Sequence, residues 1–225
     1  MSKYRIFLGI CILALPMGAC GTSGESKVPP ADWRAAVSKK AVADPVSITN
    51  TEAVHAPNWR VGSKWLYSDG YGLEVTSVKA GVTEFVRTDS PKQWIRRRGF
   101  FREAAKSTTA LRRVMYRTVK RDAGEVLTPG EPLVFTREYL SGQALRVHAT
   151  SWTVEGREVI SVPAGEFETW VVVMRTRSIK TDWTGFERWW YSPSVQNYVR
   201  LEYKYGNSEE SSRVLMSYSL AGKIS

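Results

Sequence analysis

Apolar and polar residues alternate with a period of two over much of this chain, and this pattern constrains its fold more than any other feature. In the segment 198–205, large apolar and aromatic residues alternate with charged ones: Val199, Leu201, Tyr203 and Tyr205 against Arg200, Glu202 and Lys204. Successive side chains of a strand point to opposite faces, so we expect a strand with one buried and one solvated face. The segment 214–220 repeats the scheme.

Ten further segments have the composition of short strands and are separated by turn residues. They are 64–68, 73–79, 82–87, 93–98, 111–118, 133–140, 144–152, 157–162, 169–179 and 186–191. The sequence therefore predicts a mainly β domain, built as a single curved antiparallel sheet or open barrel of about 10–12 strands with at most one or two short helices. We expect one short helix within 101–111.

The segment 169–179 is apolar on both faces. Trp170, Val172 and Met174 share one face, and Val171 and Val173 share the other. A strand of this kind is usually central and covered on both sides. We therefore expect another part of the chain, either a short helix at 31–44 or the tether (20–57), to lie across it; the alternative for 31–44 is a nascent helix within a flexible tether.

The aromatic content of the chain, which includes nine tryptophans, allows two interpretations. In the first, large rings fill the core of a small barrel; the tryptophans in or beside strand patterns are Trp65, Trp152, Trp170, Trp189 and Trp190. In the second, one wall of the domain is an open cleft that binds an apolar ligand. The candidates for lining such a cleft are Trp170, Val172, Met174, Val199 and Leu201.

Two turn motifs lie between strand patterns. The run Ser161–Phe167 (S-V-P-A-G-E-F) offers Pro163 for the first turn position and Gly165 for a left-handed conformation, and it predicts a tight hairpin. The run 189–195 (W-W-Y-S-P-S-V) leads through a second turn into the strand at 198. A third run, 61–67 (V-G-S-K-W-L-Y), opens the first strand.

These runs resemble the V-P-A-G-x-F, W-Y-S-P and G-x-W-x-Y signatures of uncharacterised bacterial envelope lipoproteins, which are similar in build to lipoprotein-localisation factors. The resemblance covers 59–220 by order of motifs and implies a curved antiparallel sheet. It supplies no catalytic residues. In the localisation factors the concave face of the sheet holds acyl chains, so the resemblance also implies a lipid or another hydrophobic ligand.

The first 19 residues have the layout of a signal peptide. Lys3 and Arg5 precede the apolar run Ile6–Leu15, which is shorter than the roughly 20 residues of a membrane-spanning helix. Small residues then precede Cys20. The whole resembles a bacterial lipoprotein signal that is cleaved before Cys20, whose thiol would carry acyl chains and anchor the mature protein to a membrane.

We accordingly divide the chain into a signal peptide (1–19), a lipidated N-terminus with a flexible tether (20–57) and an antiparallel β domain (58–225). A tether of this length spans roughly 30–37 Å. Gly21 follows the lipidated position where inner-membrane lipoproteins often carry Asp. The resemblance to that sorting pattern favours the periplasmic leaflet of the outer membrane of a diderm bacterium.

The charge of the chain points to acidic partners. Loss of residues 1–19 lowers the formal charge from +10 to +8, and export argues against nucleic acid as the partner. A cluster of arginines with aromatic neighbours is a candidate contact for anionic lipid or acidic cell-wall polymer: Arg96, Arg97, Arg98, Arg112 and Arg113, with Arg102 close by. The alternative is a solvated face that protects a strand edge.

No catalytic set is apparent, so we expect a protein that is not an enzyme. The strand pattern around His148 predicts an exposed histidine. Glu166 and Glu168 can share a strand face, while Glu155 and Glu158 are expected on opposite faces. With two distant histidines and no thiol in the folded part, neither a metal site nor a cofactor is expected. A hydrolase that uses His148 and Glu168 is the remaining enzymatic alternative.

The sequence thus predicts a membrane-anchored periplasmic lipoprotein that binds an apolar or amphipathic ligand, or an envelope protein partner. The alternative without a pocket is a structural envelope protein that contacts acidic groups through its arginines.

Overall fold

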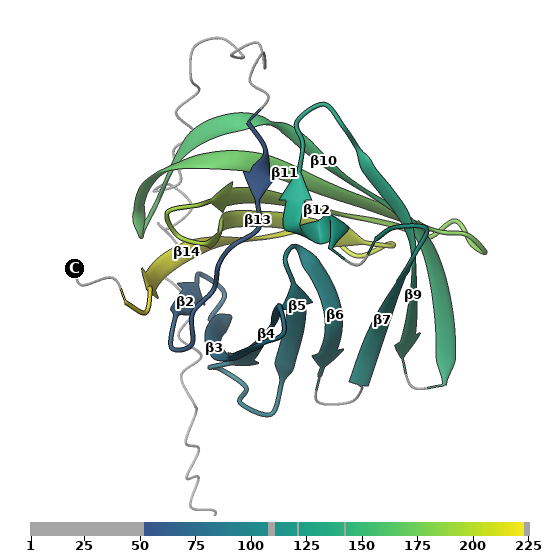
Figure 1. Cartoon of the computed structure of the whole chain (residues 1–225), viewed down its shortest axis with the longest axis horizontal. Coiled ribbons are helices and arrows are strands. Elements are labelled where there is room, and N and C mark those ends of the chain that lie inside the picture. Colours follow the sequence, from purple (N-terminus) through teal and green to yellow (C-terminus); the bar gives the residue numbers. More distant parts are fainter. Residues whose placement is uncertain (1–51, 108–110, 121, 142, 223–225) are drawn as a thin grey trace, which may run out of the picture.

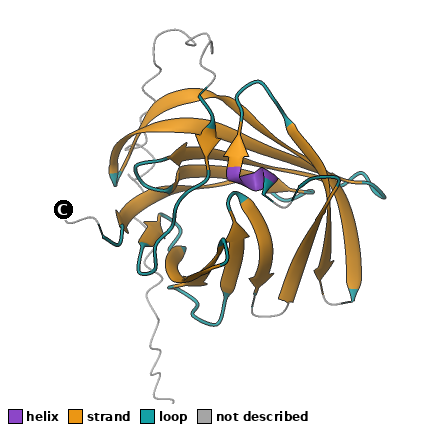
Figure 2. Cartoon of the chain, viewed as in Figure 1, coloured by secondary structure: helices purple, strands orange, loops and turns teal. Residues whose placement is uncertain are grey.

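The computed structural model describes residues 52–107, 111–120, 122–141 and 143–222. Strands dominate these ranges (Figure 2), in which the helical structure is a single 3-10 turn, η2 (Ala123–Glu125). Twelve strands form a closed antiparallel barrel (Figure 1): β2 (Lys64–Tyr67), β3 (Gly72–Lys79), β4 (Val82–Arg87), β5 (Trp94–Arg98), β6 (Phe101–Lys106), β7 (Leu111–Arg117), β9 (Leu133–Ser141), β10 (Ala144–Val162), β11 (Gly165–Ser178), β12 (Thr184–Ser192), β13 (Asn197–Tyr205) and β14 (Ser211–Ser219).

Each barrel strand pairs with the next one along the chain, and β14 pairs with β2 to close the ring. Between β7 and β9 the chain forms the short strand β8 (Val126–Leu127), which pairs with β1 (Val54–His55) outside the barrel. The prediction of a mainly β, antiparallel, barrel-like fold is confirmed. The barrel is closed and not open, because the β14–β2 ladder satisfies both of the edges that an open sheet would expose.

The predicted strands are present, with two differences. The segments 144–152 and 157–162 belong to one strand of 19 residues, β10, which continues through a bulge between Val154 and Gly156. The helix expected within 101–111 is wrong, because Phe101–Lys106 forms β6. Its Ala, Glu and Lys residues favour a helix in isolation, but the ladders to β5 and β7 outweigh that preference.

Strand β11 is buried on both faces, as its apolar pattern predicts. Val172 and Val173, which point to opposite faces, are 0% and 1% exposed. Val172 lies in register with Trp189 of β12, and Val173 lies in register with Thr153 and Arg188. The segment 31–44 and most of the tether, either of which we expected to cover this strand, lie outside the described residues.

The three motif runs meet where the barrel closes. Trp65 donates from Nε1 to the Val195 carbonyl (2.9 Å), and the Tyr67 hydroxyl donates to the Tyr198 carbonyl (3.1 Å). The predicted hairpin at 161–167 is confirmed: β10 ends at Val162 and β11 begins at Gly165, whose φ is +134°. These motifs therefore fix the seam and its nearest turns.

The small β1–β8 sheet packs against the barrel core. Val54 and Leu127 are 1% and 3% exposed. The Tyr191 hydroxyl donates to the His55 carbonyl (3.1 Å), and the Phe100 amide in the β5–β6 turn donates to the Gly124 carbonyl (2.7 Å). The described residues thus include the C-terminal end of the segment expected to be the tether; the remainder of that segment, with the lipidation candidate Cys20, is not among them.

The described part of the chain has no helix of the length and apolarity needed to cross a membrane.

Candidate functional site

Strand register separates the inner face of the barrel wall from its outer face, because directly paired residues of antiparallel strands point to the same side. One row across β10 to β13 consists of Trp152, Met174, Glu187 and Tyr203. The adjacent row consists of Ser151, Arg175, Phe186 and Lys204. Trp152 and Met174 are 4% and 3% exposed, so the first row faces the interior and the second faces outward. Each face carries a hollow.

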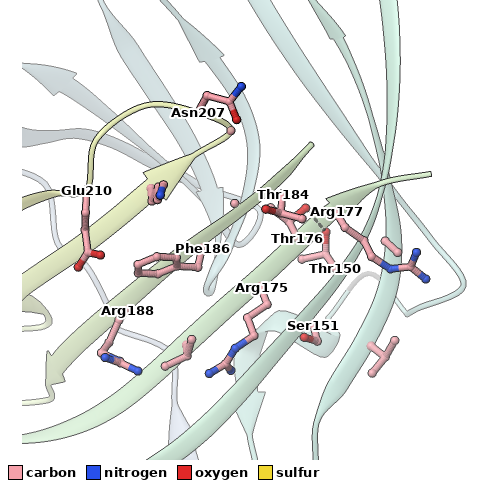
Figure 3. Close-up of a pocket in the computed structure, with 16 residues that line it drawn as sticks. Thr150, Ser151, Arg175, Thr176, Arg177, Thr184, Phe186, Arg188, Asn207 and Glu210 are labelled. Atoms are coloured by element: carbon pink, nitrogen blue, oxygen red, sulfur yellow. Dashed lines mark hydrogen bonds between the residues drawn. The ribbon is translucent and has the colours of Figure 1, made fainter. Parts of the chain in front are cut away.

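The outer hollow is a groove of about 890 Å³ (Figure 3). Phe186 lies at its floor, and Glu210 and Asn207 reach it from the turn between β13 and β14. Its basic side chains are Arg175, Arg177, Arg188 and Lys204. Two of these arginines already have carboxylate partners on the neighbouring strands.

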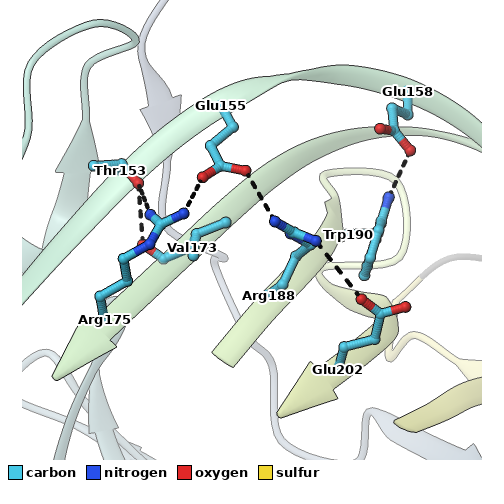
Figure 4. Close-up of polar contacts among 8 residues, drawn as sticks. All are labelled: Thr153, Glu155, Glu158, Val173, Arg175, Arg188, Trp190 and Glu202. Atoms are coloured by element: carbon cyan, nitrogen blue, oxygen red, sulfur yellow. Dashed lines mark hydrogen bonds and ion pairs between the residues drawn. The ribbon is translucent and has the colours of Figure 1, made fainter. Parts of the chain in front are cut away.

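Those partners form a charged ladder along the outer face (Figure 4). Arg175 and Arg188 both pair with Glu155, at 2.6 and 3.5 Å, and Arg188 also reaches Glu202 at 3.9 Å. Glu158 accepts a hydrogen bond from Trp190 Nε1 (2.8 Å) on the same face. We expected Glu155 and Glu158 on opposite faces, but the bulge between Val154 and Gly156 shifts the alternation. The ladder leaves these outer arginines compensated.

The inner hollow is a cavity of about 330 Å³ inside the barrel, which is at the lower end of the size range of small-molecule sites. Three tryptophans (Trp59, Trp94 and Trp189), four tyrosines (Tyr71, Tyr198, Tyr203 and Tyr205) and apolar residues such as Leu201 line it. Six basic residues also line it: Arg87, Arg97, Arg102, Lys106, Arg112 and Arg213. Among the described residues, Glu187 is the single acidic member of this lining.

Arg97 of β5 and Arg102 of β6 are directly paired across the two strands. Arg97 donates to the Phe100 carbonyl (3.2 Å), and its guanidinium carbon lies 4.8 Å from the centre of the Trp189 ring. Arg102 has a buried Nε with no hydrogen-bond partner among the described residues. Burial and the positive charge of Arg102 both lower the pKa of Arg97. Two like charges therefore face one another in the interior.

Glu187 of β12 supplies a negative charge that acts on both arginines. It is 6% exposed and accepts hydrogen bonds from Trp189 Nε1 (2.9 Å) and from the Tyr205 hydroxyl. Burial alone would raise its pKa, but the charge of Arg102, the hydrogen bond from Tyr205 and the charge of Arg97 hold the pKa below its ordinary value. Glu187 is thus ionised at neutral pH.

Arg213 of β14 is compensated on the opposite side of the cavity. It pairs with Asp69 (3.0 Å), donates to the Tyr203 hydroxyl (3.3 Å) and lies 4.1 Å from the centre of the Tyr71 ring. Burial lowers the pKa of Arg213, but its electrostatic interactions with Tyr198 and Asp69 more than offset this and raise it overall. Arg213 remains a cation in the cavity wall.

The structure divides the predicted cleft residues between core and cavity. Trp170, Val172, Met174 and Val199 are between 0% and 5% exposed and pack in the core. Leu201 lines the inner cavity. The core interpretation of the strand tryptophans is confirmed, because Trp65, Trp152, Trp170, Trp189 and Trp190 are all buried.

The structure also separates the arginines that we predicted as one surface cluster. Arg96 pairs with Glu84 (2.7 Å) and Arg98 pairs with Glu103 (2.8 Å), whereas Arg97 between them lines the inner cavity. Arg112 and Arg113 are both exposed, and Arg112 lines the cavity as well. The arginines are therefore not brought together on one face.

Sequence reasoning missed Glu187, although a signal for it was present. Glu187 has the same strand parity as Trp189 and Tyr191, so alternation places its carboxylate on the inner, aromatic face.

The prediction of an exposed His148 is wrong. His148 is 2% exposed, lies 4.5 Å from the Trp183 ring, and contacts the Tyr139 hydroxyl (3.3 Å) and Thr176 Oγ1 (3.4 Å) through its two ring nitrogens. Its inward orientation follows from strand parity, because His148 lies on the same face of β10 as the buried Thr150 and Trp152. Burial and the charges of Arg137 and Arg146 lower the pKa of His148 to about 4.

The carboxylates proposed for a hydrolase, Glu166 and Glu168, are both exposed on β11. In the described ranges, no group of three or more His, Cys, Asp or Glu residues is arranged to hold a metal ion.

Comparison with known proteins finds similarity only at the level of structure. No family model and no curated protein matches the chain. The hypothetical lipoprotein YmcC from Escherichia coli aligns with a TM-score of 0.49 at 7% identity, over 69% of this chain and 83% of that one. A candidate exported protein with a YmcC-like fold from Bacteroides fragilis aligns at 0.42 and 14% identity, over 73% and 99%. A candidate lipoprotein from Parabacteroides distasonis aligns at 0.40 and 17%, over 74% and 100%.

Proposed function

We propose that this protein is a lipid-anchored protein of the bacterial cell envelope that binds an amphipathic ligand inside its barrel. In this proposal the acylated Cys20 holds the protein at the periplasmic leaflet of the outer membrane, and the segment after it gives the barrel reach. The protein acts as a binding module in envelope assembly or transport, and it is not an enzyme.

The observation that carries the proposal is the inner cavity. Its wall combines tryptophan and aliphatic surface with arginines and tyrosine hydroxyls, so it suits a ligand with an apolar part and a polar part. Burial of apolar ligand surface there contributes about 25 cal/mol per Å². The outer groove is larger, but the arginines Arg175 and Arg188 on its wall are already paired with carboxylates.

Native mass spectrometry of the full chain, extracted from its own membranes in mild detergent, tests the proposal. We expect the wild-type protein to retain a bound amphipathic molecule. Leu201→Phe, which fills the inner cavity, should abolish retention. Val134→Phe is the matched control, because Val134 is 64% exposed and lines the outer groove.

Two results would contradict the proposal. One is a wild-type protein that carries no additional mass and acquires none when incubated with amphiphiles. The other is a bound mass that survives Leu201→Phe but is lost in Val134→Phe, which would move ligand binding to the outer groove.

A further inference from the structure

We propose that Arg97 and Arg102 form an oxyanion site in the barrel interior, which holds the phosphate or carboxylate group of an anionic amphiphile. This inference rests on the proposed function and specifies the chemistry of its ligand. It starts from the two arginines that face one another across β5 and β6, an arrangement that does not stabilise the fold.

The arrangement results from a bulge between β5 and β6. Arg96 pairs with Ala104, but Arg97 pairs with Arg102, so Glu103 is an extra residue on β6. A continuous register would place Arg97 opposite Glu103, which is a favourable cross-strand pair. The bulge instead places two arginines opposite one another, although like charges in that position are destabilising. Bulges of this kind often re-aim side chains beside functional sites.

The bulge directs the carboxylate of Glu103 towards Arg98, on the outer face of β5. Arg98 Nε lies 2.8 Å from Glu103 Oε1, and Arg98 also donates to the Ala80 carbonyl (2.9 Å). Arg97 and Arg102 have no ion pair within 4.0 Å in the described part of the chain. The register thus gives the outer arginine an ion pair, whereas the inner arginines have none among the described residues.

Glu187 compensates only part of the charge of the pair, although its own charge favours the protonated form of both arginines. Its oxygens accept hydrogen bonds from Trp189 Nε1 and the Tyr205 hydroxyl, and they make no ion pair with either arginine. Two guanidinium groups against one carboxylate leave one positive charge uncompensated in the interior, while Arg112 and Lys106, which also line the cavity, are exposed. Uncompensated charge removed from water is costly, and an oxyanion that accepts hydrogen bonds from both guanidinium groups would offset that cost.

The surroundings of the pair define the rest of the ligand. Trp189 lies against Arg97, and Ile95, Ala105 and Leu201 line the same cavity. These side chains offer apolar contact next to the anion position, so the site suits an oxyanion that is joined to an apolar chain or ring. The cavity of about 330 Å³ limits the enclosed part of the ligand to a head group with a short apolar segment.

Binding to the full chain in nanodiscs of neutral lipid tests the inference with three probes: hexyl phosphate, hexyl glucoside and inorganic phosphate. Affinity is measured by calorimetry and by the fluorescence of the cavity tryptophans. We expect hexyl phosphate to bind more tightly than either other probe. The double variant Arg97→Gln/Arg102→Gln should weaken its binding at least about tenfold, because charge-assisted hydrogen bonds are lost. The matched control Arg96→Gln/Arg98→Gln removes the same charge from the outer arginines and should leave the affinity unchanged.

Thermal unfolding of the same variants separates a ligand site from a structural one. Arg97→Gln/Arg102→Gln removes the repulsion between like charges together with the attraction of both arginines to Glu187, so a ligand site predicts an unfolding midpoint close to that of the wild type. A structural role predicts a lower midpoint. A variant that is less stable and still binds hexyl phosphate normally would overturn the inference.

The three probes distinguish failure of the inference from failure of the proposed function. Equal affinity for hexyl glucoside and hexyl phosphate would reject the oxyanion site and retain the cavity as a site for amphiphiles. Equal affinity for inorganic phosphate and hexyl phosphate would retain the oxyanion site and reject the amphipathic ligand. Absence of binding for all three probes would overturn both.

Discussion

Gly99 joins the barrel to the small β1–β8 sheet, and we predict that Gly99→Ala destabilises the protein far more than an alanine at another left-handed glycine. Gly99 has a φ of +53°, and a Cβ there would lie 2.3 Å from the Gly124 carbonyl oxygen. That oxygen also accepts the hydrogen bond of the Phe100 amide (2.7 Å). The added methyl group therefore displaces η2 or breaks this bond.

The magnitude follows from two separate costs. A left-handed conformation costs a residue with a Cβ about 1–2 kcal/mol. Loss of the hydrogen bond leaves a buried polar group unpaired, at about 1–3 kcal/mol. Gly130→Ala measures the first cost alone, because Gly130 has a φ of +80° and a Cβ there meets nothing within 4 Å. We expect a loss of about 3–4 kcal/mol for Gly99→Ala and about 1–2 kcal/mol for Gly130→Ala.

Urea unfolding followed by tryptophan fluorescence measures both free energies, and for a domain of this size the difference corresponds to several degrees in Tm. Both variants should retain the far-UV spectrum of a β protein. Equal losses for the two variants would refute the reasoning, because they would show that contact between Gly99 and Gly124 adds nothing to the backbone cost.

Three further predictions concern other parts of the molecule. Burial and the charges of Arg137 and Arg146 lower the pKa of His148 to about 4, so the unfolded state takes up a proton on this residue at a higher pH than the folded state does. The free energy of unfolding should therefore be constant above about pH 6.5 and fall by about 1–2 kcal/mol towards pH 4. Urea titrations at several pH values should show that fall, and His148→Gln should lack it. Trp65→Phe removes the hydrogen bond to the Val195 carbonyl and should cost about 2–3 kcal/mol in the same assay, whereas an unchanged midpoint would contradict the role of Trp65 in the seam. Cys20→Ala should shift the protein from the membrane pellet to the soluble fraction and abolish palmitate labelling, and a labelled variant would disprove acylation at Cys20.

The positions of the individual strands are the part of the fold that the sequence predicts best. The alternation at 198–205 and the turn at 161–167 are local signals, and each decides the structure of its own segment. The prediction of a helix within 101–111 fails because helix propensity is a local property, whereas the ladders that hold Phe101–Lys106 as β6 depend on the neighbouring strands β5 and β7. Closure of the barrel is equally non-local, since it depends on β2 and β14, which lie at opposite ends of the domain.

The inner cavity was only partly predictable, and the physical reason is the β5–β6 bulge. Alternation along the strand already places Arg97 on the opposite face from Arg96 and Arg98, and the burial of Leu201 follows from the alternation in its own strand. The partner of Arg97, however, is decided by one extra residue on β6, which exchanges Glu103 for Arg102 across the strands. A bulge has no reliable signature in a single sequence, because it changes which residues face one another without changing which residues are present.

This dependence on register links the fold to the proposed function. Deletion of Glu103 would remove the extra residue and restore a continuous β5–β6 register, in which Arg102 no longer faces Arg97. It would also remove the carboxylate partner of Arg98, so the expected result is loss of hexyl phosphate binding together with a change in stability. Glu103→Gln removes the same ion pair and keeps the bulge, and it should retain binding. If the two variants bind hexyl phosphate equally well, the bulge does not build the oxyanion site.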